Sequence, residues 1–227
     1  MVASSMKPNF YRARIASRVL LRRIRSTAQS GDQIEFLRSA LDFAAADLKL
    51  NVEHVPSIGG DNQIAGALER PKRKVLIATK FPYASQRFTW AHEIAHFILH
   101  TGTIYFRDRE LSAPGSHRDY REVEADAFAA EFLMPRNLLA KKFQVMFGEP
   151  IDGTVPNPDL VVAVSAGASQ RVKWTPEEFS SQSPLIRASA IATAHTYKGH
   201  FFASLIDQFN VSPKAMGIQL LQMGLVT

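Results

Sequence analysis

The chain has 227 residues, of which 46% are hydrophobic and 21% are charged. This composition is typical of an ordinary globular protein with one sizeable domain, or with a main domain and a small appendage. The absence of cysteine excludes disulfides, thiolate metal ligands and a cysteine nucleophile, and it fits a reducing compartment.

The net charge of +6 is concentrated in a basic N-terminal arm, residues 1–30, which has seven Lys and Arg residues and no acidic one. We interpret this arm as a solvated amphipathic helix or a frayed terminus. Contact with nucleic acid or an acidic partner, and an organellar transit peptide, are the weaker alternatives. The chain has no apolar run long enough for a membrane span or a secretory signal peptide, so we expect a cytoplasmic protein without membrane contact.

The segment after the arm predicts a helix and then a small sheet. Residues 32–50 have apolar side chains at a helical period, and residues 51–56 resemble a short strand before a turn at 59–62. Residues 64–68 and 75–79 are further predicted strands, separated by a charged loop. We therefore expect an α+β fold with a small, mainly antiparallel sheet packed on helices.

Two strong helices are predicted next. Residues 86–100 form a largely buried helix, and residues 121–134 form a second one that ends before Pro135. The polar stretch between them, 105–120, is predicted to be a loop. A helix at 137–147 completes the predicted core, residues 31–147.

The last third of the chain is less regular. Residues 148–185 are predicted to be an irregular connection, because three prolines and two glycines fall within 148–158, with a short strand at 160–164. Residues 186–227 are predicted to be a C-terminal helical segment that packs on the core. It contains helices at 186–197 and 200–209 and a final helix that begins with Ser212 as N-cap and Pro213.

The residues that suggest chemistry lie in the helix at 86–100, which contains His92-Glu93-Ile94-Ala95-His96. Residues four apart lie on one helix face, about 6 Å apart along the axis, so His92 and His96 can bind one tetrahedral ion. Glu93 is one position further and can act as the general base toward a water that the metal activates. Two surface histidines beside an unrelated glutamate are the alternative. The helix is apolar almost all round, however, and burying three polar side chains without partners would be costly.

A third ligand is required, and the helix at 121–134 contains the best candidates. Glu122 and Asp126 are one turn apart, so Glu122 can bind the ion while Asp126 orients a ligating imidazole. Glu124 is the alternative ligand; the two glutamates lie on different faces, and the one that is not a ligand is interpreted as a solvated charge. His100 lies about 12 Å along the axis from His92, so it is predicted to be a helix-end residue or an outer partner of the site.

Two histidines and one carboxylate with an open position favour a single zinc ion, Zn2+, although the ligand types also suit Mn2+. Such a site can hydrolyse an amide bond with a metal-bound water, and this reaction also requires a hydrogen-bond donor that stabilises the oxyanion. Tyr83, His117 and Tyr120 are candidates for that role, and the sequence does not choose among them.

Residues 86–100 and 121–135 resemble the ImmA/IrrE family, which are gluzincin-like zinc metallopeptidases. The first block shares Arg87, Phe88, Thr89, Ala91, His92, Glu93, His96 and His100 with the family pattern, and the second shares Glu122, Ala125, Asp126, Phe128, Ala129, Ala130, Leu133, Met134 and Pro135. The resemblance implies that His92, His96 and Glu122 bind one zinc ion and that Glu93 is the base. The basic arm and residues 148–185 are outside the pattern.

The resemblance also implies the biological role of a site-specific metalloendopeptidase that cuts a helix-turn-helix repressor, in stress response or the transcriptional regulation of mobile elements. The alternative is a metal-containing regulator that binds DNA or protein without protease activity. The intact Glu93 and a site with three protein ligands instead of four argue against that alternative.

Overall fold

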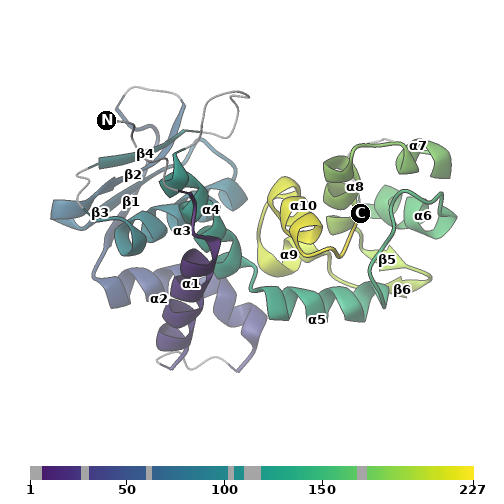
Figure 1. The fold of residues 1–227 in the computed structure, drawn as a ribbon, viewed down its shortest axis with the longest axis horizontal. Helices are drawn as coiled ribbons and strands as arrows, with labels where there is room; N and C mark the ends of the chain where they lie inside the picture. Colours follow the sequence, from purple (N-terminus) through teal and green to yellow (C-terminus); the bar gives the residue numbers. More distant parts are fainter. Residues whose placement is uncertain (1–6, 27–30, 60–62, 102–104, 110–118, 168–172) are drawn as a thin grey trace. The chain divides into compact units, whose positions relative to one another are not determined.

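The computed structural model describes residues 7–26, 31–59, 63–101, 105–109, 119–167 and 173–227. The chain divides into two compact units, Met1–Leu133 and Met134–Thr227 (Figure 1). Among the described residues, none of the helices combines the length and the apolar character that a membrane span needs. The predicted turn at 59–62 lies mostly outside the described residues.

A four-stranded sheet, in the order β1-β3-β2-β4, organises the first unit. β1 (Asn51–Val55) runs parallel to β3 (Lys74–Ala78), whereas β2 (Ile64–Glu69) pairs antiparallel with β3 and with β4 (Tyr105–Arg109). The sheet is therefore mixed and mainly antiparallel, and the prediction of an α+β fold is confirmed. The loop predicted at 105–120 is wrong in its first part: β4 has no alternation of apolar residues, and its backbone pairing with β2 forms the strand.

The described part of the first unit also contains the helices α1 (Phe10–Arg25), α2 (Gln33–Leu48), α3 (Tyr83–Leu99) and α4 (Tyr120–Leu133) and the 3-10 turn η1 (Arg70–Lys72). α3 packs on the sheet through β2 and β3 and also contacts α4, which packs on α1 (Figure 1). α3 is thus enclosed between the sheet and the other helices, in agreement with the predicted burial of its apolar sequence.

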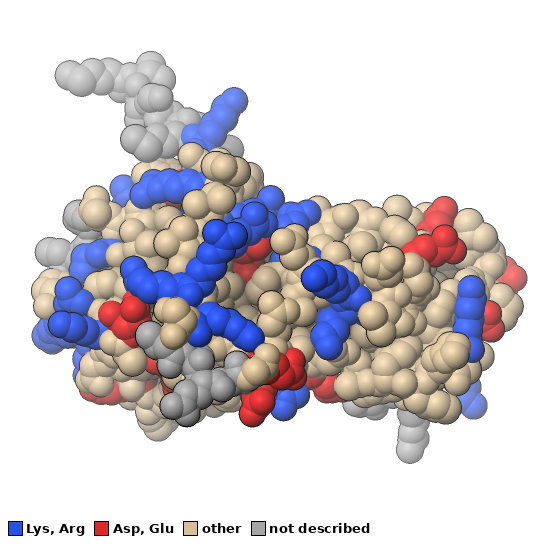
Figure 2. All heavy atoms as spheres, turned by 90° about the horizontal axis from the view of Figure 1, so that it is seen from below, with Lys and Arg blue, Asp and Glu red and all other residues tan. Residues whose placement is uncertain are grey.

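The described part of the basic arm is a docked helix, which corrects our interpretation of residues 1–30 as a separate solvated arm. Ala13, Leu20 and Ile24 recur on one face of α1 and are at most 2% exposed. The Nε–H of Arg18 donates a hydrogen bond of 2.7 Å to Glu131 of α4. Apolar burial therefore anchors α1 in the first unit. Figure 2 shows Lys and Arg side chains gathered on one face of this unit.

The second unit contains more regular structure than the sequence predicted. Its elements are α5 (Arg136–Phe147), α6 (Pro158–Gly167), α7 (Pro176–Ser180), α8 (Pro184–Ala192), β5 (Thr196–Tyr197), β6 (His200–Phe201), α9 (Leu205–Phe209) and α10 (Pro213–Gln222). The irregular connection expected at 148–185 contains α6 and α7. The strand expected at 160–164 is part of α6, where the apolar residues 160, 163 and 164 are buried at a helical spacing. α5, part of the core that the sequence predicts at 31–147, lies in this unit.

A β-hairpin separates the predicted helices at 186–197 and 200–209, so both are shorter than expected. β5 and β6 pair around Lys198 and Gly199, which have positive φ angles of 47° and 80°. Two consecutive positive φ angles are typical of the tight turns that join antiparallel strands. The start of the last helix is as predicted: the Ser212 side chain accepts a hydrogen bond from the Ala215 N–H, and Pro213 is the first helical residue.

Candidate metal centre

Gly66 allows β2 to approach α3 closely at the predicted site. A Cβ atom at Gly66 would lie 2.4 Å from Cγ2 of Thr89 and 3.0 Å from Oε1 of Glu93. Glycine is therefore required here because the side chains of α3 occupy the space of a Cβ. Our sequence analysis missed this residue, although a glycine inside an apolar strand is a known indication of close approach by a neighbour.

The structure brings three of the predicted site residues together at one point. His92 and His96 are buried on α3, and their Nε2 atoms are 2.9 Å apart. Glu122, in the first turn of α4, has Oε2 at 3.1 Å from Nε2 of His92 and Oε1 at 3.4 Å from Nε2 of His96. Two nitrogens and one carboxylate thus converge from two packed helices.

These donor atoms have the spacing that a bound metal ion requires. The potential ligand atoms of the three residues all lie within 4.8 Å of one another. Bonds of about 2.1 Å in tetrahedral geometry place ligand atoms about 3.4 Å apart, close to the separations found between the imidazoles and the carboxylate. The group can therefore hold a metal ion, and its ligand types suit zinc.

Asp126 contacts the opposite side of the His92 ring. Its Oδ1 atom lies 3.0 Å from Nδ1 of His92, one turn after Glu122 on α4. A carboxylate in this position accepts the Nδ1–H and leaves Nε2 available as a ligand. The contact has the geometry that the orienting role of Asp126 requires, and the role itself stays a prediction.

The protonation states of the site also suit metal binding. Burial lowers the pKa of His96 from 6.5 to about 4, so this imidazole is neutral at pH 7. Burial raises the pKa of Glu122, but hydrogen bonds from His92 and His96 outweigh this effect and lower its pKa below the ordinary value. A neutral imidazole and an ionised carboxylate are the forms that bind metals.

Glu93 lies on α3 directly after His92, and its side chain is fully buried. The carboxylate lies against β2 at Gly66, where no side chain intervenes. Because consecutive helical residues point about 100° apart, Glu93 flanks the two histidines and does not share their face.

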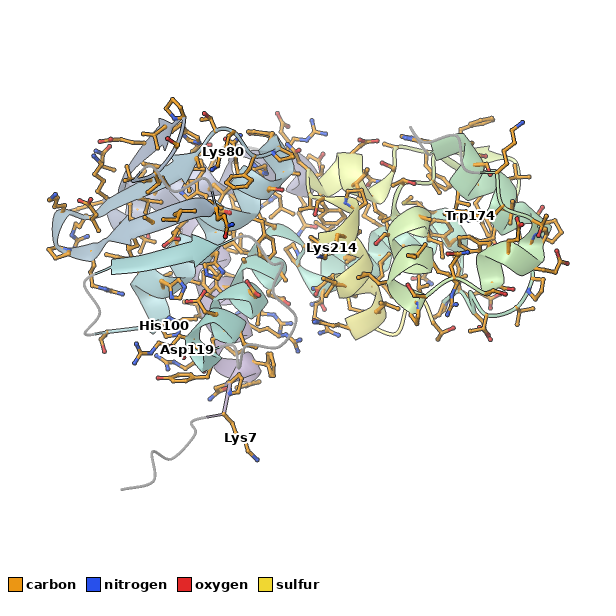
Figure 3. All side chains as sticks on the ribbon, turned by 90° about the horizontal axis from the view of Figure 1, so that it is seen from above. Lys7, Lys80, His100, Asp119, Trp174 and Lys214 are labelled. Atoms are coloured by element: carbon orange, nitrogen blue, oxygen red, sulfur yellow. The ribbon has the colours of Figure 1, made fainter. Side chains whose placement is uncertain are left out.

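His100 and Glu124 form a second buried pair beside the site. His100 follows the last residue of α3 (Figure 3), and its Nδ1 lies 3.0 Å from Nδ1 of His96. Its Nε2 lies 3.1 Å from Oε2 of Glu124, whose exposure is 2%. The position of His100 at a helix end and next to His96 agrees with the prediction. The interpretation of Glu124 as a solvated charge is wrong, because α1 and His100 enclose it.

The candidate donors to the oxyanion are not equally placed. Tyr83 is 60% exposed at the first residue of α3, more than two helical turns before His92. Tyr120 begins α4, two residues before Glu122, and its hydroxyl oxygen accepts a hydrogen bond from Nε–H of Arg121. His117 lies outside the described residues. Of the two described candidates, Tyr120 is the nearer to a site residue along the chain, and its role as a donor stays a prediction.

A comparison with protein families finds a match to the Peptidase M78 family, described as the IrrE N-terminal-like domain, at residues 44–149. The matched segment includes all of α3 and α4, and hence the converging residues. It excludes α1 and most of the second unit. A comparison with curated proteins finds no match.

Proposed function

We propose that the protein is a zinc-dependent endopeptidase, because residues 44–149 match the model of the Peptidase M78 family, the IrrE N-terminal-like domain. His92, His96 and Glu122 hold the metal, and Glu93 is the general base. The observation that carries this proposal is the convergence of the three ligand groups within 4.8 Å, on helices that also supply an orienting carboxylate. Three protein ligands leave an open position, as catalytic zinc sites do, whereas structural zinc sites usually have four.

Each residue of the site has a definite task in peptide hydrolysis. Zinc, when bound, lowers the pKa of water toward about 7 and polarises the carbonyl group of the scissile peptide. Glu93 accepts the proton of the attacking water and passes it to the leaving nitrogen. Asp126 accepts a hydrogen bond from Nδ1–H of His92 and thereby keeps this imidazole in the tautomer whose Nε2 can bind the metal. Gly66 lets β2 cover Glu93 and keeps bulk water away from one side of its carboxylate.

The family implies a protein substrate, and within that class we propose a helix-turn-helix repressor. The support for this finer assignment is the combination of the two motif blocks that resemble ImmA/IrrE peptidases. Cleavage would then release genes of a stress response or of a mobile element, and the reaction would take place in the cytoplasm.

The test of this function separates metal binding from proteolysis. The purified protein should contain about one zinc ion per chain by elemental analysis. Where a helix-turn-helix repressor is encoded beside its gene, the protein should cut that repressor at one site, as read by mass spectrometry. Glu93→Gln should retain zinc and the fold but lose about 10²–10⁴ in rate, because only the proton acceptor is removed. A Glu93→Gln variant as active as the wild type would remove Glu93 from the mechanism. A zinc-loaded wild type that binds the repressor without cutting it would favour the regulator without protease activity.

A further inference from the structure

The two candidate histidine ligands have different partners behind them. Nδ1 of His92 meets the carboxylate of Asp126 directly. Nδ1 of His96 instead meets a second imidazole, His100, and a carboxylate lies only beyond that ring, on Glu124. Ligating histidines usually donate their other N–H to a carboxylate, a carbonyl or water. The connection through His100 is therefore the unusual one and needs an explanation.

When His96 binds a metal through Nε2, the hydrogen bonds from His96 to His100 and from His100 to Glu124 can be donated in only one direction. Its Nδ1 must then carry the hydrogen and donate it to the lone pair on Nδ1 of His100. His100 consequently has its own hydrogen on Nε2 and donates it to Oε2 of Glu124, at 3.1 Å. Both imidazoles remain neutral, and the carboxylate of Glu124 is the final acceptor.

Glu124 is held in place from its other side by the N-terminus of α1. The backbone N–H of Asn9, the N-cap of α1, donates to Oε1 of Glu124 at 2.7 Å. The positive end of the helix dipole favours a carboxylate at this position and offsets part of the cost of burying it. With both oxygens engaged, the carboxylate cannot turn away from His100.

We propose that His100 and Glu124 are positioning residues for the metal, which fix the tautomer and ring orientation of His96 and thereby increase the affinity of the site for zinc. This inference rests on the metal centre of the proposed function. It also gives the N-terminal helix a part in the site, because Glu124 is fixed between His100 and the first residues of that helix.

The affinity of the full-length protein for zinc, measured by competition with a chromophoric chelator, tests this role. Glu124→Gln keeps the size of the side chain but removes the charge and one of the two acceptor oxygens. We expect it to raise the Kd for zinc about 10- to 100-fold, the range typical of residues that orient metal ligands. His100→Gln removes the connecting imidazole and should give a loss of the same order, so the test does not depend on the folding of a single variant.

Glu131→Gln is the matched control. Glu131 lies on the same helix, is also 2% exposed, and also joins α4 to α1, through its hydrogen bond from Arg18. Its substitution disturbs a buried carboxylate of the same kind about 10 Å further along the axis of α4 than Glu124. We expect Glu131→Gln to change the Kd for zinc by less than about threefold, even if it lowers the melting temperature as much as Glu124→Gln does.

The tautomers provide a readout that a merely structural role would not produce. In the zinc-loaded wild type, long-range proton–nitrogen NMR spectra should show the hydrogen of His96 on Nδ1 and that of His100 on Nε2. A hydrogen on Nδ1 of His100 would overturn the proposal. So would equal affinities of Glu124→Gln and the wild type, or equal losses in Glu124→Gln and Glu131→Gln. Failure of the wild type to take up zinc would instead overturn the metal centre itself, and the positioning role with it.

Discussion

Nδ1 of His92 lies 3.0 Å from Oδ1 of Asp126, while Nε2 of the same ring lies 3.1 Å from Oε2 of Glu122. One imidazole is therefore held between two carboxylates of α4 that are a single helical turn apart. The two carboxylates have different neighbours: Glu122 also reaches His96, whereas Asp126 contacts the ring nitrogen of His92 that faces away from Glu122 and His96.

This difference predicts an order of zinc affinities. Glu122→Ala removes a ligand and should nearly abolish zinc binding. Asp126→Ala leaves all three ligands and should raise the Kd about 10- to 100-fold, because the His92 ring loses its orienting acceptor. Titration of zinc into the metal-free variants measures both effects. A larger loss in Asp126→Ala than in Glu122→Ala would reverse the two roles.

Gly66→Ala should disturb both stability and catalysis, because the new Cβ would meet Thr89 and Glu93 of α3. Forcing a methyl group into a packed interface typically costs about 1–3 kcal/mol. We expect a loss of this order in denaturant unfolding, together with slower peptide cleavage. Gly31→Ala is the control, since its Cβ would meet nothing within 4 Å. Thr89→Ser removes the nearest methyl group, so the double variant with Gly66→Ala should recover part of the stability. A lack of recovery would show that Thr89 is not the obstacle.

The metal-free protein should lose stability in mild acid. The pKa of His96 is about 4 in the folded state and 6.5 ordinarily, so between these values the unfolded chain binds more protons. The free energy of unfolding should therefore fall as the pH is lowered from about 7 to about 4, by at most about 3 kcal/mol from this group. Glu122, whose pKa is lowered by folding, adds a loss of the same sign below about pH 4.5.

Denaturant unfolding of the metal-free protein at a series of pH values measures this dependence. His96→Gln carries no titrating imidazole, so its stability should change less between pH 7 and pH 4. An equally steep change in the variant would assign the acid sensitivity to other groups.

Two neighbouring residues of α1 test whether the basic arm is structural. Leu20 is 2% exposed and Val19 is 54% exposed. Leu20→Ala should destabilise the protein by about 2–5 kcal/mol through the cavity it leaves, whereas Val19→Ala should have an effect within about 0.5 kcal/mol. Thermal or denaturant unfolding compares the two. Similar small effects from both would restore the interpretation of the arm as a solvated terminus.

Local periodicity explains why much of the site could be predicted from the sequence. A helix places residues four apart on one face whatever surrounds it, so the pairing of His92 with His96, and of Glu122 with Asp126, follows from spacing alone. The burial of the first helix follows in the same way from its apolar residues. The sequence therefore determined both helices and the residues that they could offer to a metal.

Only the tertiary structure shows which of the two candidate glutamates, Glu122 or Glu124, lies beside the two histidines. The rotation of α4 about its axis, which is set by its packing on α3 and α1, turns Glu122 toward the two histidines and Glu124 toward His100. The strand β4 and the docking of α1 depend in the same way on distant partners: Asn9 is 115 residues from Glu124 in the chain. A pattern within a short stretch of sequence does not show which distant residues will be in contact. The energy of such contacts comes from surfaces that meet only when the chain has folded.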